Sequence, residues 1–350
     1  MRLRNRLIGL AVGSATAAVA GVLVDRSVSR RRRAGLAEVD ELGSLTGDVT
    51  TVTAGDGVSL HCEVDEVAPP STAAELLRMP TLVFVHGFTC NLHTWHFQRL
   101  HFRGRRRMVF YDHRSHGRSG RSSRENATVE QLARDLLTVV DSLAPDEQLF
   151  LVGHSMGGMA IIALADLHPE LFGSRVVGVG LCSTSGGAIA LHKVLGLPGP
   201  VGAQLPGRVI ALAAKAPALV DRARRAGSNI GYATVGAFAF GTPVPGAYVE
   251  LVDQMIASTP FEVISEFFPS LQAHDKYDAL KALAAVPTYV FCGTRDRVTP
   301  VSHSRDLHNL VAGSTLVEYE QGGHMIPLEF HDQLNASLDE LCDRADELAR

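Results

Sequence analysis

A serine, an aspartate and a histidine are the residues of this sequence whose types and spacing best suit chemistry. Ser155 is the centre of Gly153-His154-Ser155-Met156-Gly157, a G-x-S-x-G pattern. A serine hydroxyl is a weak nucleophile and needs a base beside it and an acid to orient that base. His324 and Asp296 supply those residue types. The chain order Ser155, Asp296, His324 is the one expected for a serine on a sharp strand-to-helix turn.

The elements that must position these residues are short apolar runs. They cover residues 81–85, 107–111, 149–153, 176–182, 288–292 and 315–319. Continuous apolar runs of this length suit buried parallel strands. Ser155 follows the third run, Asp296 the fifth and His324 the sixth. All three are therefore expected at the carboxyl edge of one sheet, where sites in open α/β sheets gather.

Hairpin and helix patterns complete the α/β architecture. Residues 51–67 hold two strand-like runs around Ala54-Gly55-Asp56-Gly57, a hairpin signal. Thr128 opens a capping-box pattern that leads an apolar periodicity to Leu143. Further helices are expected over 156–167 and 330–348. Strands alternating with helices predict a mostly parallel, doubly wound sheet.

The long interval before the fifth run breaks this rhythm. Residues 184–275 are rich in Gly, Ala, Pro and Leu, and their helix-like pieces predict an inserted helical cap. The core is then expected over 49–183 and 276–350. The cap's apolar character suits either a lining for a hydrophobic acyl group or the cap's own core.

Backbone groups near Ser155 are expected to complete the site. Two N–H donors must hold a developing oxyanion, one from Met156 and the other from Phe88 in the loop after residues 81–85. Gly87, Gly153 and Gly157 are predicted to shape tight turns, since glycine tolerates crowded backbone. The two flanking histidines, His86 and His154, are expected to orient loops rather than to transfer protons. The spacing of His113 and His116 offers no third ligand, so no metal site is expected.

Taken together, these motifs resemble the α/β-hydrolase superfamily, most of all its bacterial esterases, lipases and non-haem perhydrolases with HGF and GHSMGG signatures. The resemblance covers about residues 50–345. It rests on V-F-V-H-G-F (83–88), Y-D-H-R-S-H-G-R-S (111–119), G-H-S-M-G-G (153–158), G-T-R-D (293–296) and G-G-H (322–324). It implies the α/β-hydrolase fold, a cap between the sixth and seventh strands, and no metal or organic cofactor. Ser115 departs from the family pattern, which usually has glycine there.

The expected reaction is hydrolysis of carboxylic esters, lipid-like esters and thioesters included, through an acyl-enzyme. A hydrophobic small-molecule ester is the expected partner. Perhydrolysis of the haloperoxidase type and C–C bond cleavage use the same triad and remain alternatives. An alternative of another class is a non-catalytic binding protein on the hydrolase fold. Epoxide and haloalkane hydrolases are disfavoured, because those relatives place an aspartate where Ser155 stands.

The first 35 residues differ from the rest of the chain. They hold eight arginines against one acid, Asp25, whereas the whole chain has a net charge of −4. Residues 7–24 carry no charge, and 18 helical residues come close to spanning a hydrocarbon core. This predicts a membrane anchor over 1–35, a connector over 36–48 and a catalytic part on the cytoplasmic side. A signal peptide cut after Ala20, with export, and an apolar helix packed on the domain are the alternatives.

Composition excludes several other classes of protein. Hydrophobic residues make up 46% of the chain, too many for a disordered protein, and the acidic balance disfavours nucleic-acid binding. Five cysteines without a metal spacing are expected to be free thiols. Small residues recur every fourth position within 7–24 and favour self-association of that helix. They are Gly9, Gly13, Ala17 and Gly21.

Overall fold

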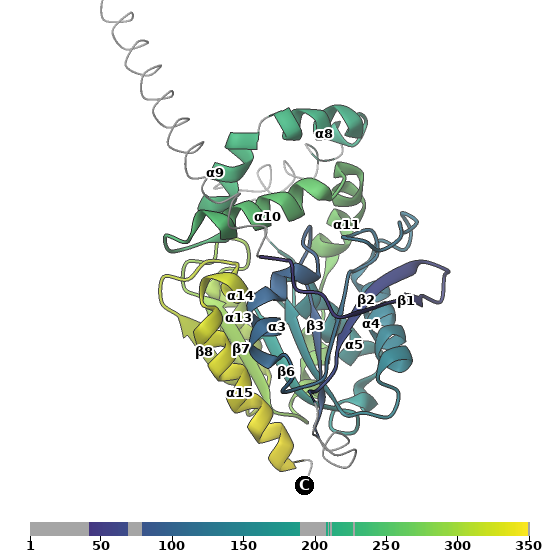
Figure 1. The fold of residues 1–350 in the computed structure, drawn as a ribbon, viewed down its shortest axis with the longest axis vertical. Helices are drawn as coiled ribbons and strands as arrows, with labels where there is room; N and C mark the ends of the chain where they lie inside the picture. The colour runs from purple at the N-terminus through teal and green to yellow at the C-terminus, as the bar shows by residue number, and fades with distance from the viewer. Residues whose placement is uncertain are drawn as a thin grey trace, which may run out of the picture.

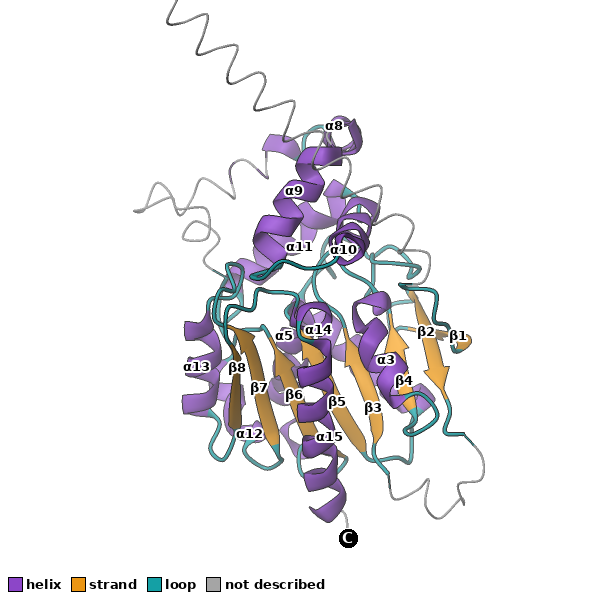
Figure 2. Cartoon of the chain, turned by 60° about the vertical axis from the view of Figure 1, so that its left-hand side comes forward, coloured by secondary structure: helices purple, strands orange, loops and turns teal. Residues whose placement is uncertain are grey.

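An eight-stranded, mostly parallel sheet runs through the part of the chain that the structure describes. The computed structural model describes residues 42–68, 79–189, 208, 210, 212–226 and 228–348. The strands are β1 (Asp48–Thr53), β2 (Ser59–Asp65), β3 (Thr81–Val85), β4 (Met108–Tyr111), β5 (Leu149–His154), β6 (Val176–Cys182), β7 (Thr288–Gly293) and β8 (Thr315–Tyr319). Their order is β1-β2-β4-β3-β5-β6-β7-β8. β2 runs antiparallel to both β1 and β4, and the remaining neighbouring strands are parallel to one another (Figure 2).

Alternation of side chains along the strands gives the sheet two apolar faces. In β3, Leu82 and Phe84 pack with Trp95 on one face. Val83 and Val85 belong to the core on the other face. Successive strand side chains point to opposite faces, so a run that is apolar at every position must be covered on both.

Helices cover both faces of the sheet. The core that contains Val83 and Val85 is closed by α4 (Val129–Leu143), α5 (Met156–Leu167), α12 (Leu280–Leu283) and α13 (Val301–Leu310). The opposite face is closed by α3 (His96–Phe102), α14 (Ile326–Glu329) and α15 (His331–Leu348). Short 3₁₀ turns are η1 (Leu92–Trp95), η2 (Pro169–Leu171) and η3 (Tyr277–Ala279). Thr128 is the N-cap residue of α4, as its sequence pattern predicted. Its Oγ1 accepts the N–H of Gln131 at 3.1 Å.

Between β6 and β7 the chain leaves the sheet and forms helices above its carboxyl edge (Figure 1). They are α8 (Pro217–Ala226), α9 (Ser228–Ala239), α10 (Gly246–Ser258) and α11 (Phe261–Ala273). We call these four helices and the link between α9 and α10 the cap. The chain leaves and rejoins the core at one place, because the N–H of Lys276 donates to the carbonyl of Gly186 at 2.8 Å.

The predicted alternation of strands and helices is confirmed. Each of the six apolar runs forms a strand, and residues 51–67 contribute to the β1–β2 hairpin, which begins at Asp48. Helices α4, α5 and α15 lie where their patterns predicted them. The turn η1 and helix α3 were not predicted.

The predicted N-terminal anchor, residues 7–24 included, lies outside the described residues. Within the described ranges, no helix combines the length and the apolarity needed to cross a bilayer. All five cysteines are free and buried.

Candidate active site

Ser155 occupies a strained turn between β5 and α5. Its φ of +52° and ψ of −117° lie in a region that non-glycine residues rarely adopt. The N–H of Ser155 donates to the carbonyl of Cys182 at 2.9 Å. The carbonyl of Ser155 accepts the hydroxyl of Thr184 at 2.6 Å. These bonds hold the strained backbone, so that the side chain lies at the carboxyl end of β5.

Close packing around this turn explains the glycines of the G-x-S-x-G pattern. A Cβ on Gly157 would lie 2.1 Å from the carbonyl oxygen of Val85. A Cβ on Gly153 would lie 2.6 Å from the N–H nitrogen of Gly158. A Cβ on Gly87 would lie 2.8 Å from Nδ1 of His154. The missing side chains let β3, β5 and α5 approach one another at the site.

Replacing Gly157 by alanine is expected to lower the free energy of unfolding by about 3 kcal/mol or more. The obstacle to the new methyl group is main chain, which cannot rotate away. Urea unfolding followed by circular dichroism measures the change. Gly55→Ala is the matched control, because nothing lies within 4 Å of its added Cβ. It should shift the free energy by no more than about 0.5 kcal/mol. Equal behaviour of the two variants would contradict this account of the turn.

Asp296 and His324 meet at the ends of β7 and β8. The Nδ1 atom of His324 lies 2.8 Å from Oδ2 of Asp296. Oδ1 of Asp296 accepts the N–H groups of Val298 at 2.8 Å and Thr299 at 2.9 Å. The Thr299 hydroxyl lies 2.9 Å from Oδ2. These donors fix the orientation of the carboxylate, so that Oδ2 faces the imidazole of His324.

These contacts also set the charge of Asp296. Burial disfavours its ionised form, but His324 and the donors of Thr299 outweigh burial and hold the pKa of Asp296 below its usual value. An ionised Asp296 accepts a hydrogen bond from the N–H at Nδ1 of His324, which leaves Nε2 as the acceptor nitrogen of a neutral imidazole. This is the state of a histidine that can act as a general base.

The flanking histidines join the loops of the site. The His154 ring nitrogen Nε2 lies 3.0 Å from the carbonyl of His324, which links the turn at Ser155 to the loop after β8. The His86 ring accepts the N–H of His113 at Nε2, 2.9 Å away. Its Nδ1 then donates to the carbonyl of Gly87 at 2.8 Å. Both rings are buried and fixed by main-chain partners, as orienting side chains would be.

The two N–H groups expected to hold an oxyanion belong to residues beside Ser155. Met156 is the first residue of α5, so its N–H has no partner within the helix. Phe88 follows β3 and lines the same cavity as Ser155, Met156 and His324. The structure thus brings together the two loops from which both donors would come.

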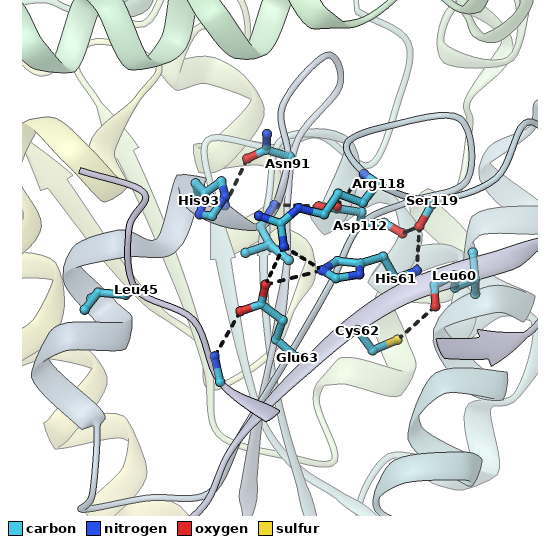
Figure 3. Close-up of polar contacts among 12 residues, drawn as sticks. Leu45, Leu60, His61, Cys62, Glu63, Asn91, His93, Asp112, Arg118 and Ser119 are labelled. Carbon is cyan, nitrogen blue, oxygen red and sulfur yellow. Dashed lines mark hydrogen bonds and ion pairs between the residues drawn. The ribbon is translucent and has the colours of Figure 1, made fainter. Parts of the chain in front are cut away.

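Asp112 is a site-shaping residue that the sequence reasoning did not single out. It follows β4 and is 1% exposed. Its carboxylate accepts the N–H of Leu92 at 2.9 Å and the N–H of Arg118 at 2.8 Å. It thereby joins the loop after β3, which carries Phe88, to the loop after β4 (Figure 3). Its position directly after an apolar run is the sequence feature from which Asp112 could have been identified.

Strained backbone gathers around the site. Among the described residues, the non-glycine residues with positive φ follow five different strands at the carboxyl edge: Thr89, Ser115, Ser155, Ser183 and Gln321. Ser115 has a φ of +66°, which explains why the family usually has glycine there. Its hydroxyl compensates by accepting the N–H of Ser122 at 2.8 Å. The departure at Ser115 therefore preserves the loop.

A cluster of buried histidines lies behind the site. The rings of His86 and His113 are 4.5 Å apart, and those of His86 and His116 are 5.7 Å apart. Burial lowers the pKa of His113 to about 3, that of His116 to about 4 and that of His154 to about 3. Burial also holds the pKa of His86 well below its ordinary value. All four rings are thus neutral in the folded protein near neutral pH.

This cluster predicts acid sensitivity of the fold. An unfolded histidine titrates near pH 6.5, so below that pH the unfolded chain binds more protons than the folded chain. Stability should fall from about pH 6.5 towards pH 4, by up to about 1.4 kcal/mol per pH unit for each histidine. Urea unfolding at several pH values measures the slope. His116→Asn, which removes one titrating group, should make the slope shallower. An unchanged slope would contradict the prediction.

An apolar cavity opens at Ser155 and extends under the cap. Its volume is about 810 Å³. Its floor includes Ser155 and His324, and its walls are mostly apolar side chains from the cap and from the loop after β3. The wall residues on α9 and α10 include Val235, Phe238, Val252 and Ile256. A cavity of this size holds a ligand with a substantial apolar group.

Comparison with known proteins agrees with this architecture. An uncharacterised protein of Mycobacterium tuberculosis is 27% identical over 260 residues, covering 72% of this chain and 71% of that protein. A thermophilic esterase from Thermogutta terrifontis shares the fold with a TM-score of 0.65 at 21% identity, covering 86% of this chain and 100% of the esterase. A membrane phospholipase A, described as a bacterial virulence factor, has a TM-score of 0.63 at 18% identity, covering 98% of this chain and 99% of that one.

The family itself is established by sequence. The model of the alpha/beta hydrolase family matches residues 82–337, which include β3, the turn at Ser155, and the loops of Asp296 and His324. The match spans more than two thirds of the chain. This chain belongs to the alpha/beta hydrolase family.

Proposed function

We propose that the protein is a serine hydrolase of carboxylic esters with a hydrophobic acyl group. The observation that carries the proposal is one cavity with Ser155 and His324 at its floor and apolar cap side chains as its walls. The Asp296–His324 pair supports it, because it provides an oriented base beside a strained serine. A binding protein that had only kept the fold would have no need of this complete set.

The reaction follows from the roles of these groups. Oγ of Ser155 attacks the ester carbonyl while Nε2 of His324 takes the hydroxyl proton. Asp296 stabilises the imidazolium that forms, and the N–H groups of Phe88 and Met156 hold the oxyanion. The tetrahedral intermediate then expels the alcohol, which receives the proton from His324. This leaves an acyl group on Ser155.

Water completes the cycle. His324 takes a proton from a water molecule as its oxygen attacks the acyl carbonyl. The second tetrahedral intermediate collapses, the carboxylic acid leaves, and the proton returns to Ser155. Each of the two steps thus starts and ends with a neutral His324, and the full cycle regenerates the free hydroxyl of Ser155.

A series of p-nitrophenyl esters, from acetate to palmitate, tests the proposal. Because the cavity walls are apolar, kcat/KM should rise with acyl length until the chain fills the cavity and then fall. The measurement is the rate of p-nitrophenol release. A folded protein that hydrolyses none of these esters would refute the proposal and favour the binding-protein alternative.

Narrowing the cavity should shift the preferred chain length. Val252 on α10 lines the cavity and is 2% exposed, so Val252→Phe is expected to move the optimum towards shorter acyl chains. The loss with the longest preferred ester should be roughly tenfold in kcat/KM, a cost of about 1.4 kcal/mol. Gln254→Phe is the control on the same helix, since Gln254 is exposed and does not line the cavity. An unchanged profile for Val252→Phe would place the acyl group elsewhere.

We further propose that residues 7–24 attach the hydrolase to a membrane. The support is their uncharged length and the arginines on both sides. Carbonate extraction of membranes that contain the full chain, compared with a variant lacking residues 1–35, tests this. The full chain should stay with the membrane pellet. Release of the full chain into the supernatant would refute the attachment.

A further inference from the structure

Glu329 joins the cap to the loop of His324. The carboxylate lies at the end of α14, five residues after His324. Its Oε1 accepts the N–H of Gly241 at 2.9 Å and the hydroxyl of Thr242 at 2.7 Å, both in the link between α9 and α10. Its Oε2 accepts the N–H of Gly323 at 2.7 Å. One carboxylate thus receives donors from the cap and from the residue next to His324.

Direct contact between the same two segments reinforces this junction. A Cβ on Gly241 would lie 2.0 Å from the carbonyl oxygen of Gln321, and one on Gly323 would lie 2.4 Å from the nitrogen of Gly241. The N–H of Met325 donates to the carbonyl of Ala239, the last residue of α9, at 2.8 Å. The residues on both sides of His324 are therefore bonded to, or packed against, the cap.

Helix α9 also forms a wall of the cavity. Val235, Phe238 and Ala239 line the cavity from α9, and Met325 lines it from the loop of His324. An apolar chain in the cavity therefore presses on the helix whose end is bonded to the histidine loop. The contacts with Glu329 continue that connection to Gly323.

We propose that Glu329 is a positioning residue that couples filling of the cavity to the placement of His324. The inference rests on the proposed function for its kinetic consequence. A substrate that fills the cavity packs against α9 and restricts its movement, and the hydrogen bonds of Glu329 then hold the loop of His324 in the reactive position. A short ester does not reach α9 and leaves it free to move. The acyl chain therefore raises kcat, not only affinity.

Glu329→Gln separates this role from folding. An amide has one acceptor oxygen, and the donors from the link between α9 and α10 will claim it. The amide NH₂ group then faces the N–H of Gly323, where no hydrogen bond can form. The bonds within the cap link persist, while the bond to the loop of His324 is lost. Asp332→Asn is the control, because Asp332 is a highly exposed carboxylate three residues away.

Hydrogen exchange of the full chain, followed by mass spectrometry, tests the coupling without turnover. The probe is 1-decanol, an uncharged chain that cannot be hydrolysed. In the wild type and in Asp332→Asn, decanol should slow exchange in the peptide that contains Gly323 by about tenfold. In Glu329→Gln, decanol should leave that exchange unchanged. No effect of decanol on the wild type, or the same effect in all three proteins, would overturn the coupling.

Kinetics supply the second readout. For the wild type, kcat should be higher with the octanoate than with the acetate p-nitrophenyl ester. Glu329→Gln should abolish that rise, about tenfold, while the KM for octanoate stays within about twofold. A kcat lowered equally for both esters would overturn the coupling. Absence of all ester turnover in the wild type, with the decanol effect intact, would refute the proposed function and leave the coupling standing.

Discussion

Ser155→Ala is expected to lower kcat for ester hydrolysis by roughly a million-fold. The variant keeps the Asp296–His324 pair and the cavity, but it has no oxygen at the end of β5 to form the acyl-enzyme. The remaining rate comes from bound water alone. Alanine is smaller than serine and has to adopt the same strained φ at this position. The substitution therefore adds no clash, and the protein should still fold.

Single-turnover and steady-state hydrolysis of p-nitrophenyl octanoate measure this effect. Ser142→Ala is the control, since Ser142 is an exposed serine on α4 whose hydroxyl donates to the carbonyl of Thr138. Ser142→Ala should retain the wild-type rate. Circular dichroism shows whether Ser155→Ala and Ser142→Ala are folded. A folded Ser155→Ala protein with more than about one hundredth of the wild-type kcat would contradict the assignment of the nucleophile.

Asp296→Asn is expected to lower kcat by about 10⁴-fold. An asparagine keeps the size of the side chain, but its amide NH₂ cannot accept a hydrogen bond from the N–H at Nδ1 of His324. If its oxygen turns towards His324, the NH₂ faces the N–H groups of Val298 and Thr299 instead. With the NH₂ towards His324, the imidazole loses the acceptor that fixes its tautomer. With the oxygen towards His324, the N–H groups of Val298 and Thr299 lose theirs. The imidazolium also loses the negative charge that stabilises it.

The contrast with Asp306→Asn isolates this role. Asp306 lies on α13 and is exposed, so its amide variant should hydrolyse esters at the wild-type rate. The low pKa of Asp296 means that its ionised form stabilises the fold above the ordinary aspartate pKa of about 3.8. That stabilisation is lost only as the pH falls through the lowered value. An activity loss in Asp296→Asn should therefore be present throughout the neutral range. Equal activities of the two variants would contradict the role of Asp296.

Local patterns were enough to predict the sheet and the approach of Asp296 to His324 at its carboxyl edge. Parallel strands end at one edge, so residues that directly follow apolar runs must gather there. Asp296 and His324 each follow such a run, and the structure places them 2.8 Å apart. The motifs also predicted the cap between β6 and β7.

Contacts that depend on the path of the cap could not be predicted in the same way. The bond between Glu329 and Gly241 joins residues 88 positions apart, and no spacing rule connects them. The position of Asp112 after its strand is clear from the sequence. Its hydrogen-bond partner Leu92, however, lies in the turn η1, which no sequence pattern predicted. Helix α3 is short and lacks a side-chain cap, which explains why it escaped the sequence reasoning.

The most direct test of the central claim is to find which residue a fluorophosphonate modifies. This reagent forms a stable phosphonyl ester only with a serine activated by its neighbours. Peptide mapping by mass spectrometry after labelling should find one adduct, on the peptide that contains Ser155, and Asp296→Asn should label far more slowly. An active esterase that labels on another residue, or that keeps its full labelling in Ser155→Ala, would contradict the account.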